Sequence, residues 1–199
     1  MRDRFVLRAI ERGLHLNIRT GLLVDRKNPG PAADLPLSLR AARAPRYDGS
    51  MDITISLDPA RLDLDRVHAW LRTAYWSPDV RRDVVERAFA NSLSAGAYDE
   101  AGQVGVARAV TDQATFAWLC DVFVDERARG RGVARAMVRA LMSDPRTQTL
   151  RRWVLATRTA HGVYAPLGYA PVDARIWMEM KPPAERWQDV SAASARTLP

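Results

Sequence analysis

The stretch from Phe116 to Met142 joins an apolar segment to a turn rich in arginine and glycine and then to a segment of helical spacing. A helix N-terminus carries unpaired N–H groups and a partial positive charge, so it suits an anion. Gly130 and Gly132 would let a phosphate reach those N–H groups, and Arg127, Arg129 and Arg131 add donors that match phosphate oxygens. The stretch predicts a diphosphate site.

Two common phosphate loops do not fit this spacing. The pattern Gly, four residues, Gly-Lys-Ser/Thr is absent from the sequence. A dinucleotide loop needs a small residue three positions after its second glycine, where this chain has Arg135. About 20 residues further on, where that fold places an acid, the chain has Arg151 and Arg152.

A second block lies downstream. Residues 153–157 have the composition of a buried strand, and Ala160 and Tyr164 follow at a spacing of four. Gly168-Tyr169 closes the block, and glycine is the residue that ends a helix at least cost.

Together, the spacing Arg127-x-x-Gly130-x-Gly132 and this second block resemble the GNAT superfamily of acyl-CoA-dependent N-acetyltransferases. The resemblance covers about 130 residues, from Ile53 to Met180. Two positions depart from the family pattern. Thr157 stands where Asn is frequent, and Pro166 is expected to kink or shorten the second helix.

The resemblance implies acetyl-CoA as cosubstrate, and no metal is expected. In the family the loop binds the pyrophosphate of coenzyme A, and the strand before it pairs with the pantetheine arm. Carried over to this chain, the cofactor-binding residues are Val122, Phe123, Val124, Arg127, Arg129, Gly130, Arg131, Gly132, Val133, Ala134 and Ala160.

Acyl transfer to an amine also needs acid–base groups. The phenol of Tyr164 is protonated at neutral pH and can donate to a departing sulfur, as its place in the second block implies by resemblance. The alternative is a tyrosine that only packs. For the oxyanion, the resemblance points to the backbone N–H of Val124 or its neighbour.

Asp121 is the candidate base. Strict alternation puts Leu119, Asp121 and Phe123 on one face of a strand, where a bare carboxylate is costly. Asp121 could take the amine proton, bind a cationic acceptor or anchor a loop. Cys120, the single cysteine, excludes an internal disulfide, and its apolar flanks favour an inert thiol over a nucleophile. The three histidines show no metal-ligand spacing.

The acceptor pocket is expected near Tyr75 and Trp76, between the first two helices, with Trp177 as a further contact. Core packing is the competing interpretation for these aromatic residues. A small-molecule or peptide amine is expected as acceptor, and its identity stays open.

Periodicity predicts one α/β (α+β) domain over 51–181. The resemblance implies a GNAT-type, mostly antiparallel sheet of about six to seven strands, flanked by about four helices. Strands are expected at 52–57, 95–98, 104–110, 115–124, 152–157 and 174–180. Helices are expected at 64–75, 83–93, 132–142 and 160–167. Residues 182–199 are expected to form a flexible tail, on which Trp187 could dock.

Residues 1–50 hold ten Lys/Arg and five Asp/Glu, which is +5 of the chain's total charge of +7. We expect this extension to be poorly ordered or a mis-assigned start; an amphipathic arm, with Phe5 to Ile18 at helical spacing, and a cleaved targeting peptide are the alternatives. The nearly neutral remainder argues against a nucleic-acid partner, and no apolar run suggests a membrane span. A cytoplasmic monomer or homodimer is expected.

The leading hypothesis is an acetyl-CoA-dependent N-acetyltransferase that works by direct transfer in a ternary complex. A non-catalytic acyl-CoA-binding sensor on the same fold is the alternative. Such a sensor would keep the loop and bind the cofactor without turnover, and replacing Tyr164 by Phe would cause no measurable change.

Overall fold

The computed structural model describes residues 14–16, 23–25 and 53–189. Two short strands near the N-terminus, β1 (Leu14–Leu16) and β2 (Leu23–Asp25), pair antiparallel. They differ from the amphipathic helix that the spacing between Phe5 and Ile18 suggests. The rest of the N-terminal extension lies outside the described residues, as does the chain after residue 189.

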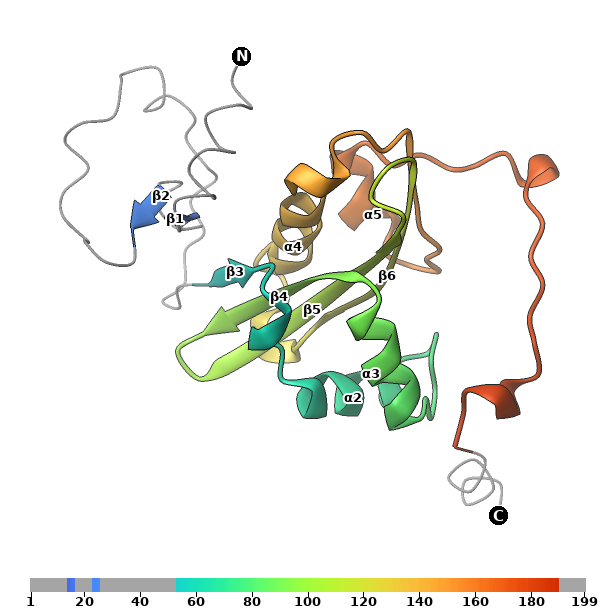
Figure 1. The fold of residues 1–199 in the computed structure, drawn as a ribbon, viewed down its shortest axis with the longest axis horizontal. Helices are drawn as coiled ribbons and strands as arrows, with labels where there is room; N and C mark the ends of the chain where they lie inside the picture. The colour runs from blue at the N-terminus through green and yellow to red at the C-terminus, as the bar shows by residue number, and fades with distance from the viewer. Residues whose placement is uncertain (1–13, 17–22, 26–52, 190–199) are drawn as a thin grey trace.

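The central sheet has five strands in the order β3-β4-β5-β6-β7 (Figure 1). Neighbouring strands run antiparallel except β6 and β7, which are parallel. The strands are β3 (Thr54–Ser56), β4 (Leu93–Asp99), β5 (Gly102–Thr111), β6 (Phe116–Val124) and β7 (Arg152–Val154).

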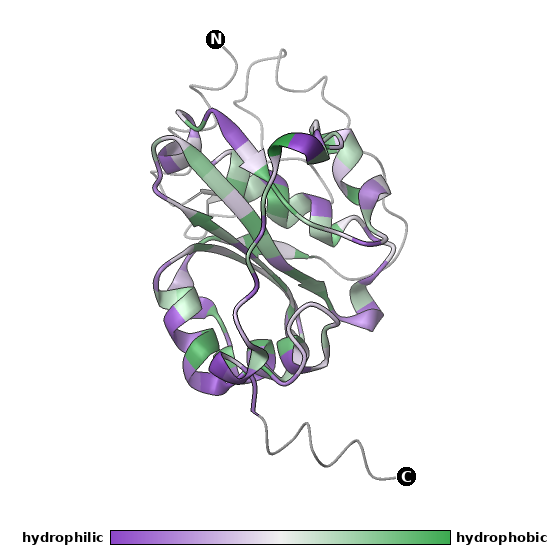
Figure 2. Ribbon diagram, turned by 90° about the vertical axis from the view of Figure 1, so that its right-hand side faces the viewer, coloured by the Kyte–Doolittle hydropathy of each residue, from purple (hydrophilic) through white to green (hydrophobic). Residues whose placement is uncertain are grey.

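Helices cover both faces of this sheet. On one face lie α2 (Leu64–Thr73) and α3 (Arg82–Ala90), and on the other lie α4 (Val133–Met142) and the short α5 (His161–Tyr164) (Figures 1 and 2). Each layer has its own apolar core: Val67, Leu71 and Phe89 pack over Val106, whereas Met137 and Leu141 of α4 belong to the opposite cluster. Burying these stripes is the main stabilising contribution to the fold.

Local signals explain where the helices begin and end. The side chain of Asp63 accepts the N–H of Arg66 and caps α2. After α5, Pro166 lies in a 3₁₀ turn over Ala165–Leu167 that ends at Gly168, whose φ is +93°. The expected shortening of this helix by proline and its closure by glycine are both confirmed.

The predicted fold class is confirmed, with fewer strands than expected. The strand predicted at 174–180 is wrong. A 3₁₀ turn over Ala174–Ile176 stands there, because the side chain of Asp173 accepts the N–H of Arg175 and pairs with its guanidinium at 2.8 Å. Beyond the turn the chain is extended and unpaired, and Met178 is 99% exposed.

The last described residues return to the α2–α3 layer. The ring of Trp187 packs against the cluster that holds Val67 and Leu71. The Asp189 N–H donates to the Asp79 carbonyl at 2.8 Å, and Gln188 Nε2 donates to the Pro78 carbonyl at 3.0 Å. The expected tail is thus anchored as far as Asp189. Within the described part of the chain, no helix has the length and apolarity needed to cross a bilayer.

Candidate active site

The predicted diphosphate site lies at the N-terminus of α4. Gly132 is the N-cap with φ +75°, and Gly130 has φ +72°, both in the left-handed region that glycine adopts without strain. No side chain caps α4, and its first turn holds no acidic residue. A Cβ added at Gly130 would meet nothing within 4 Å. The first N–H groups of α4 are therefore without side-chain caps and suited to an anion.

Two of the loop arginines are paired with carboxylates. Arg127 lies 2.9 Å from Asp99 of β4, and Arg129 lies 3.2 Å from Glu126. The Arg129 guanidinium also donates to the Val124 carbonyl at 3.0 Å. A diphosphate would have to compete with these carboxylates for Arg127 and Arg129. The N–H groups at the start of α4 are therefore stronger candidates for binding it than the arginine side chains.

The end of β6 has an open side. β6 and β7 pair only from Phe116↔Arg152 to Trp118↔Val154, so β6 continues for six residues beyond the last pair. On its other side β6 pairs with β5, where the Asp125 N–H donates to Val104 and Val124 lies opposite Gly105. Because successive residues of an antiparallel strand point their N–H groups to opposite sides, the N–H of Val124 points to the open side.

Asp121 lies on a β-bulge. Val106 pairs with Phe123 and Arg108 with Cys120, so Asp121 and Val122 together face one residue of β5. The φ of Asp121 is +50°, a conformation that Asp tolerates better than most residues. The predicted common face for Leu119, Asp121 and Phe123 is wrong: Leu119 packs in the α4 layer and Phe123 in the α2–α3 layer. The extra residue reverses the alternation.

The bulge directs Asp121 toward a cationic and an aromatic neighbour. Its Oδ2 accepts from Arg108 Nε at 2.7 Å, and its Oδ1 accepts from Trp76 Nε1 at 3.2 Å. Arg108 also donates to Ser92 Oγ at 3.0 Å and lies 5.6 Å from the Phe89 ring centre. Asp121 is therefore fixed in orientation, with lone pairs left for an amine.

Breaking the pair of Arg108 and Asp121 should destabilise the fold, because the two side chains are only 15% and 12% exposed and the remaining charge would stay buried without a partner. Asp121→Ala leaves a mostly buried guanidinium without its carboxylate. We expect it to lower the free energy of unfolding by about 3 kcal/mol in urea titrations. The double variant Arg108→Leu with Asp121→Ala should recover part of that loss. A change below about 1 kcal/mol in the single variant would contradict this.

Tyr164 ends α5, half-buried against the α4 layer, with its ring 5.9 Å from the ring of Tyr169. Burial raises the pKa of the Tyr164 phenol, and the neighbouring Tyr75 raises it further. The group is a phenol, not a phenolate, across the physiological pH range. Ala160 is the N-cap of α5, and its N–H donates to Thr157 Oγ1 at 3.0 Å.

Tyr75 links the two halves of the site. Its hydroxyl accepts the N–H of Arg158 at 3.3 Å, and its ring stands edge-on to Trp76 with centres 5.0 Å apart. The structure thus brings together four predicted residues: Tyr75, Trp76, Asp121 and Tyr164. Tyr75 and Trp76 are 47% and 40% exposed, as residues that line a site should be.

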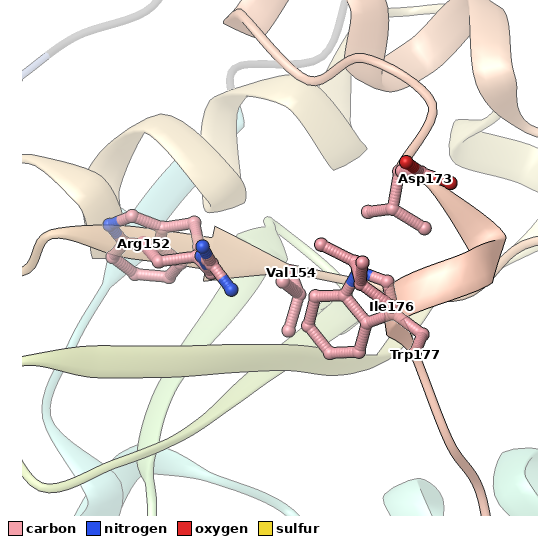
Figure 3. Close-up of a pocket in the computed structure, with 7 residues that line it drawn as sticks. Arg152, Val154, Asp173, Ile176 and Trp177 are labelled. Atoms are coloured by element: carbon pink, nitrogen blue, oxygen red, sulfur yellow. The ribbon is translucent and has the colours of Figure 1, made fainter.

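Trp177, the remaining predicted acceptor contact, lies apart from these four residues. Its ring is 5.7 Å from the Arg152 guanidinium, beside a cavity of about 230 Å³ that β7 and residues 172–177 line (Figure 3). This cavity is a shallow feature at the edge of the sheet.

Cys120 is no candidate nucleophile. Burial, followed by the charge of Asp121, raises the pKa of its thiol to about 12. We expect iodoacetamide to label Cys120 at pH 8 at least about a hundredfold more slowly in the folded protein than in the urea-unfolded chain. Equal labelling rates, followed by mass spectrometry, would contradict this. No group of His, Cys, Asp and Glu in the described segments is arranged to hold a metal ion.

Comparison with known proteins places this geometry in a family. Residues 91–171, which include the loop and the second block, match the family model of the acetyltransferase (GNAT) domain. A crystal structure from Xanthomonas campestris pv. campestris, assigned as a GNAT acetyltransferase, is 40% identical with a TM-score of 0.63. The match covers 66% of this chain and 94% of that one. This chain belongs to the GNAT family.

Two other relatives of this GNAT chain are more distant. A curated protein of Gibberella zeae, assigned as an acetyltransferase, is 30% identical over 110 residues; the match covers 45% of this chain and 62% of that protein, less than two thirds of its length. A Clostridium acetobutylicum acetyltransferase, solved with acetyl-CoA, is 14% identical with a TM-score of 0.51, over 66% of this chain and 96% of that one. At that identity the likeness shows the fold alone.

Sequence reasoning missed Arg108 and Arg158, which surround the GNAT-type site. Arg108 is a single cation within an apolar strand, as Asp121 is a single anion within the next. Two such lone charges on strands joined by a hairpin are a signal for a cross-strand ion pair. Arg158, 4.8 Å from the Tyr75 ring centre, gave no comparable signal.

Proposed function

We propose that this chain is an N-acetyltransferase that moves an acetyl group from acetyl-CoA to a primary amine in a ternary complex. The observation that carries the proposal is that the open side of β6 leads to the N-terminus of α4. Asp121 lies on β6 itself, and Tyr164 packs against the same apolar cluster as Val124. An extended chain that ends in a diphosphate fits a free strand edge followed by free N–H groups.

The residues that would hold coenzyme A are those of the open edge and the loop. The N–H groups after Gly132 would bind the diphosphate, and the edge at Val122 to Val124 would pair with the pantetheine arm. Acetyl-CoA supplies an acyl group activated as a thioester. The N–H of Val124, which points to the open side, is the candidate donor to the carbonyl oxygen.

The acceptor amine would enter from the side of Tyr75 and Trp76. The carboxylate of Asp121 would hold the amine and take a proton from it as the new C–N bond forms. Tyr164 would give its phenolic proton to the sulfur as the C–S bond breaks, which yields a thiol. Asp121 and Tyr164 then return to their starting states by proton exchange with solvent.

Calorimetric titration of the full chain tests the donor side of this proposal. We expect binding of acetyl-CoA and coenzyme A, and none of NADH or ATP at the same concentrations. Thiol release in the presence of a panel of amines then tests turnover. Equal binding of all four nucleotides would contradict the coenzyme site, and coenzyme A binding without release from any amine would indicate the sensor module instead.

A further inference from the structure

The sheet carries an uncovered apolar surface at one end of β5 and β6. Val110, Phe116 and Trp118 are 43%, 36% and 37% exposed, although they lie on strands of the central sheet. Val110 and Trp118 are directly opposite each other, and Phe116 is two residues from Trp118 on the same face. We call these three residues the apolar shelf.

The apolar shelf continues the candidate active site. Residues two apart on a strand share a face, so Val110 lies beside Arg108 and Trp118 beside Cys120, which pair with each other. Arg108 reaches Phe89 of α3, which identifies this face as the one that α2 and α3 cover further along. At about 3.3 Å per residue, the shelf begins roughly 10 Å from Asp121.

A second segment with exposed apolar side chains starts at β7, the strand next to β6. Trp177 is held against β7, next to Val154, the strand partner of Trp118. Trp187 is held in the α2–α3 layer, next to the residues that follow Tyr75 and Trp76. The segment 178–183 between these points, here called the strap, crosses from one layer to the other on the side that faces the viewer in Figure 2. Its Met178 and Met180 are 99% and 79% exposed.

We infer that the acceptor is a primary amine with an apolar, aryl-bearing body, which lies on the apolar shelf with its nitrogen at Asp121. The inference rests on the proposed function and narrows its acceptor. The shelf lies on the same face of the sheet as Arg108, the ion-pair partner of Asp121. The strap starts at Trp177, which lines one cavity with Val154, the strand partner of Trp118. The methionine side chains of the strap suit an aromatic ring. A small polar amine would leave this surface in water.

Turnover of two matched amines tests the inference. We expect kcat/KM for 2-phenylethylamine to exceed that for ethanolamine on the order of thirtyfold, because only the former buries apolar area on the shelf. Trp118→Ser should lower the ratio of the two kcat/KM values about tenfold, mostly through KM. Trp118→Phe, which keeps an aromatic ring on the shelf, should leave the ratio close to that of the parent protein.

Binding of the amine can also be measured directly, without turnover and without a substitution in the shelf. In full-length protein labelled at the methionine methyl groups and saturated with coenzyme A, 2-phenylethylamine should shift the signals of Met178 and Met180. Ethanolamine should not. Met178→Leu and Met180→Leu assign the two signals.

These measurements distinguish failure of the shelf as the acceptor site from failure of the proposed acetyl transfer. Equal kcat/KM values for both amines and an unchanged ratio in Trp118→Ser would overturn the shelf while leaving acetyl transfer in place. Methyl shifts with 2-phenylethylamine, but no thiol release from any amine, would support the shelf as a binding site and overturn the transferase. Absence of shifts at both methionines would overturn their role around the acceptor.

Discussion

Tyr164→Phe is expected to lower kcat by about a hundredfold to ten-thousandfold, the usual range for loss of a general acid. The ring keeps its contact with Tyr169 and its place in the α4 layer, so folding and coenzyme A affinity should change little. Only the proton for the departing sulfur is lost. Steady-state thiol release, together with calorimetric titration of coenzyme A, measures the two effects separately.

The chain offers a matched control at Tyr169. Its hydroxyl is buried and has no hydrogen-bond partner among the described residues. Tyr169→Phe therefore removes the same atom from the neighbouring ring, and we expect kcat to stay within about threefold of the parent value. Equal losses in both variants would mean that Tyr164 acts through packing, and no loss in either would remove it from the mechanism.

The pH dependence of kcat/KM should reflect the protonation of Tyr164. Burial and Tyr75 raise the pKa of Tyr164, so its acid form persists well into alkaline pH. Between pH 6 and 9 the neutral, reactive fraction of an alkyl amine, whose pKa is about 10, rises about tenfold per pH unit. We expect kcat/KM to rise through this window without a decline on the alkaline side. A decline centred below pH 9 would contradict a protonated Tyr164 as the acid.

Gly132→Asp should weaken coenzyme A binding at least tenfold more than Gly132→Asn does. Both side chains have the same shape and both tolerate the left-handed backbone that Gly132 adopts, with φ +75°. Only Asp places a negative charge at the N-terminus of α4, where the proposal puts a diphosphate. Like charges brought together in this way cost several kcal/mol.

Calorimetric titration of the two variants, with thermal unfolding as a check of the fold, gives the comparison. Affinities equal to that of the parent protein in both variants would show that the site at α4 does not hold the diphosphate. A loss in both variants to the same extent would indicate steric blocking alone. The charge-specific difference is therefore the informative quantity.

The parts of the site that sequence predicts well are local ones. The loop before α4 and the turn after α5 depend on glycine and proline at fixed spacing, and Gly132, Pro166 and Gly168 behave as their chemistry requires. The position of Tyr75 and Trp76 between two helices is likewise predictable, because the periodicity of both helices is clear.

Long-range and competing local effects explain the rest. One extra residue at Asp121 reverses which side chains share a face, and alternation alone cannot reveal a bulge. Residues 174–180 have the residue pattern of a strand, but Asp173 stabilises a local turn over Ala174–Ile176 instead. Arg158 reaches Tyr75 only because the chain after β7 returns to the α2–α3 connection.

Two-substrate kinetics with analysis of the intact protein mass tests direct transfer to an amine, the central claim. Acetyl-CoA and an accepted amine are varied together, and free thiol, N-acetyl product and acetylated protein are quantified. We expect intersecting double-reciprocal lines, one thiol per amide formed and no acetylated protein. Parallel lines with an acetyl group on the protein, or thiol release that yields only acetate, would contradict direct transfer.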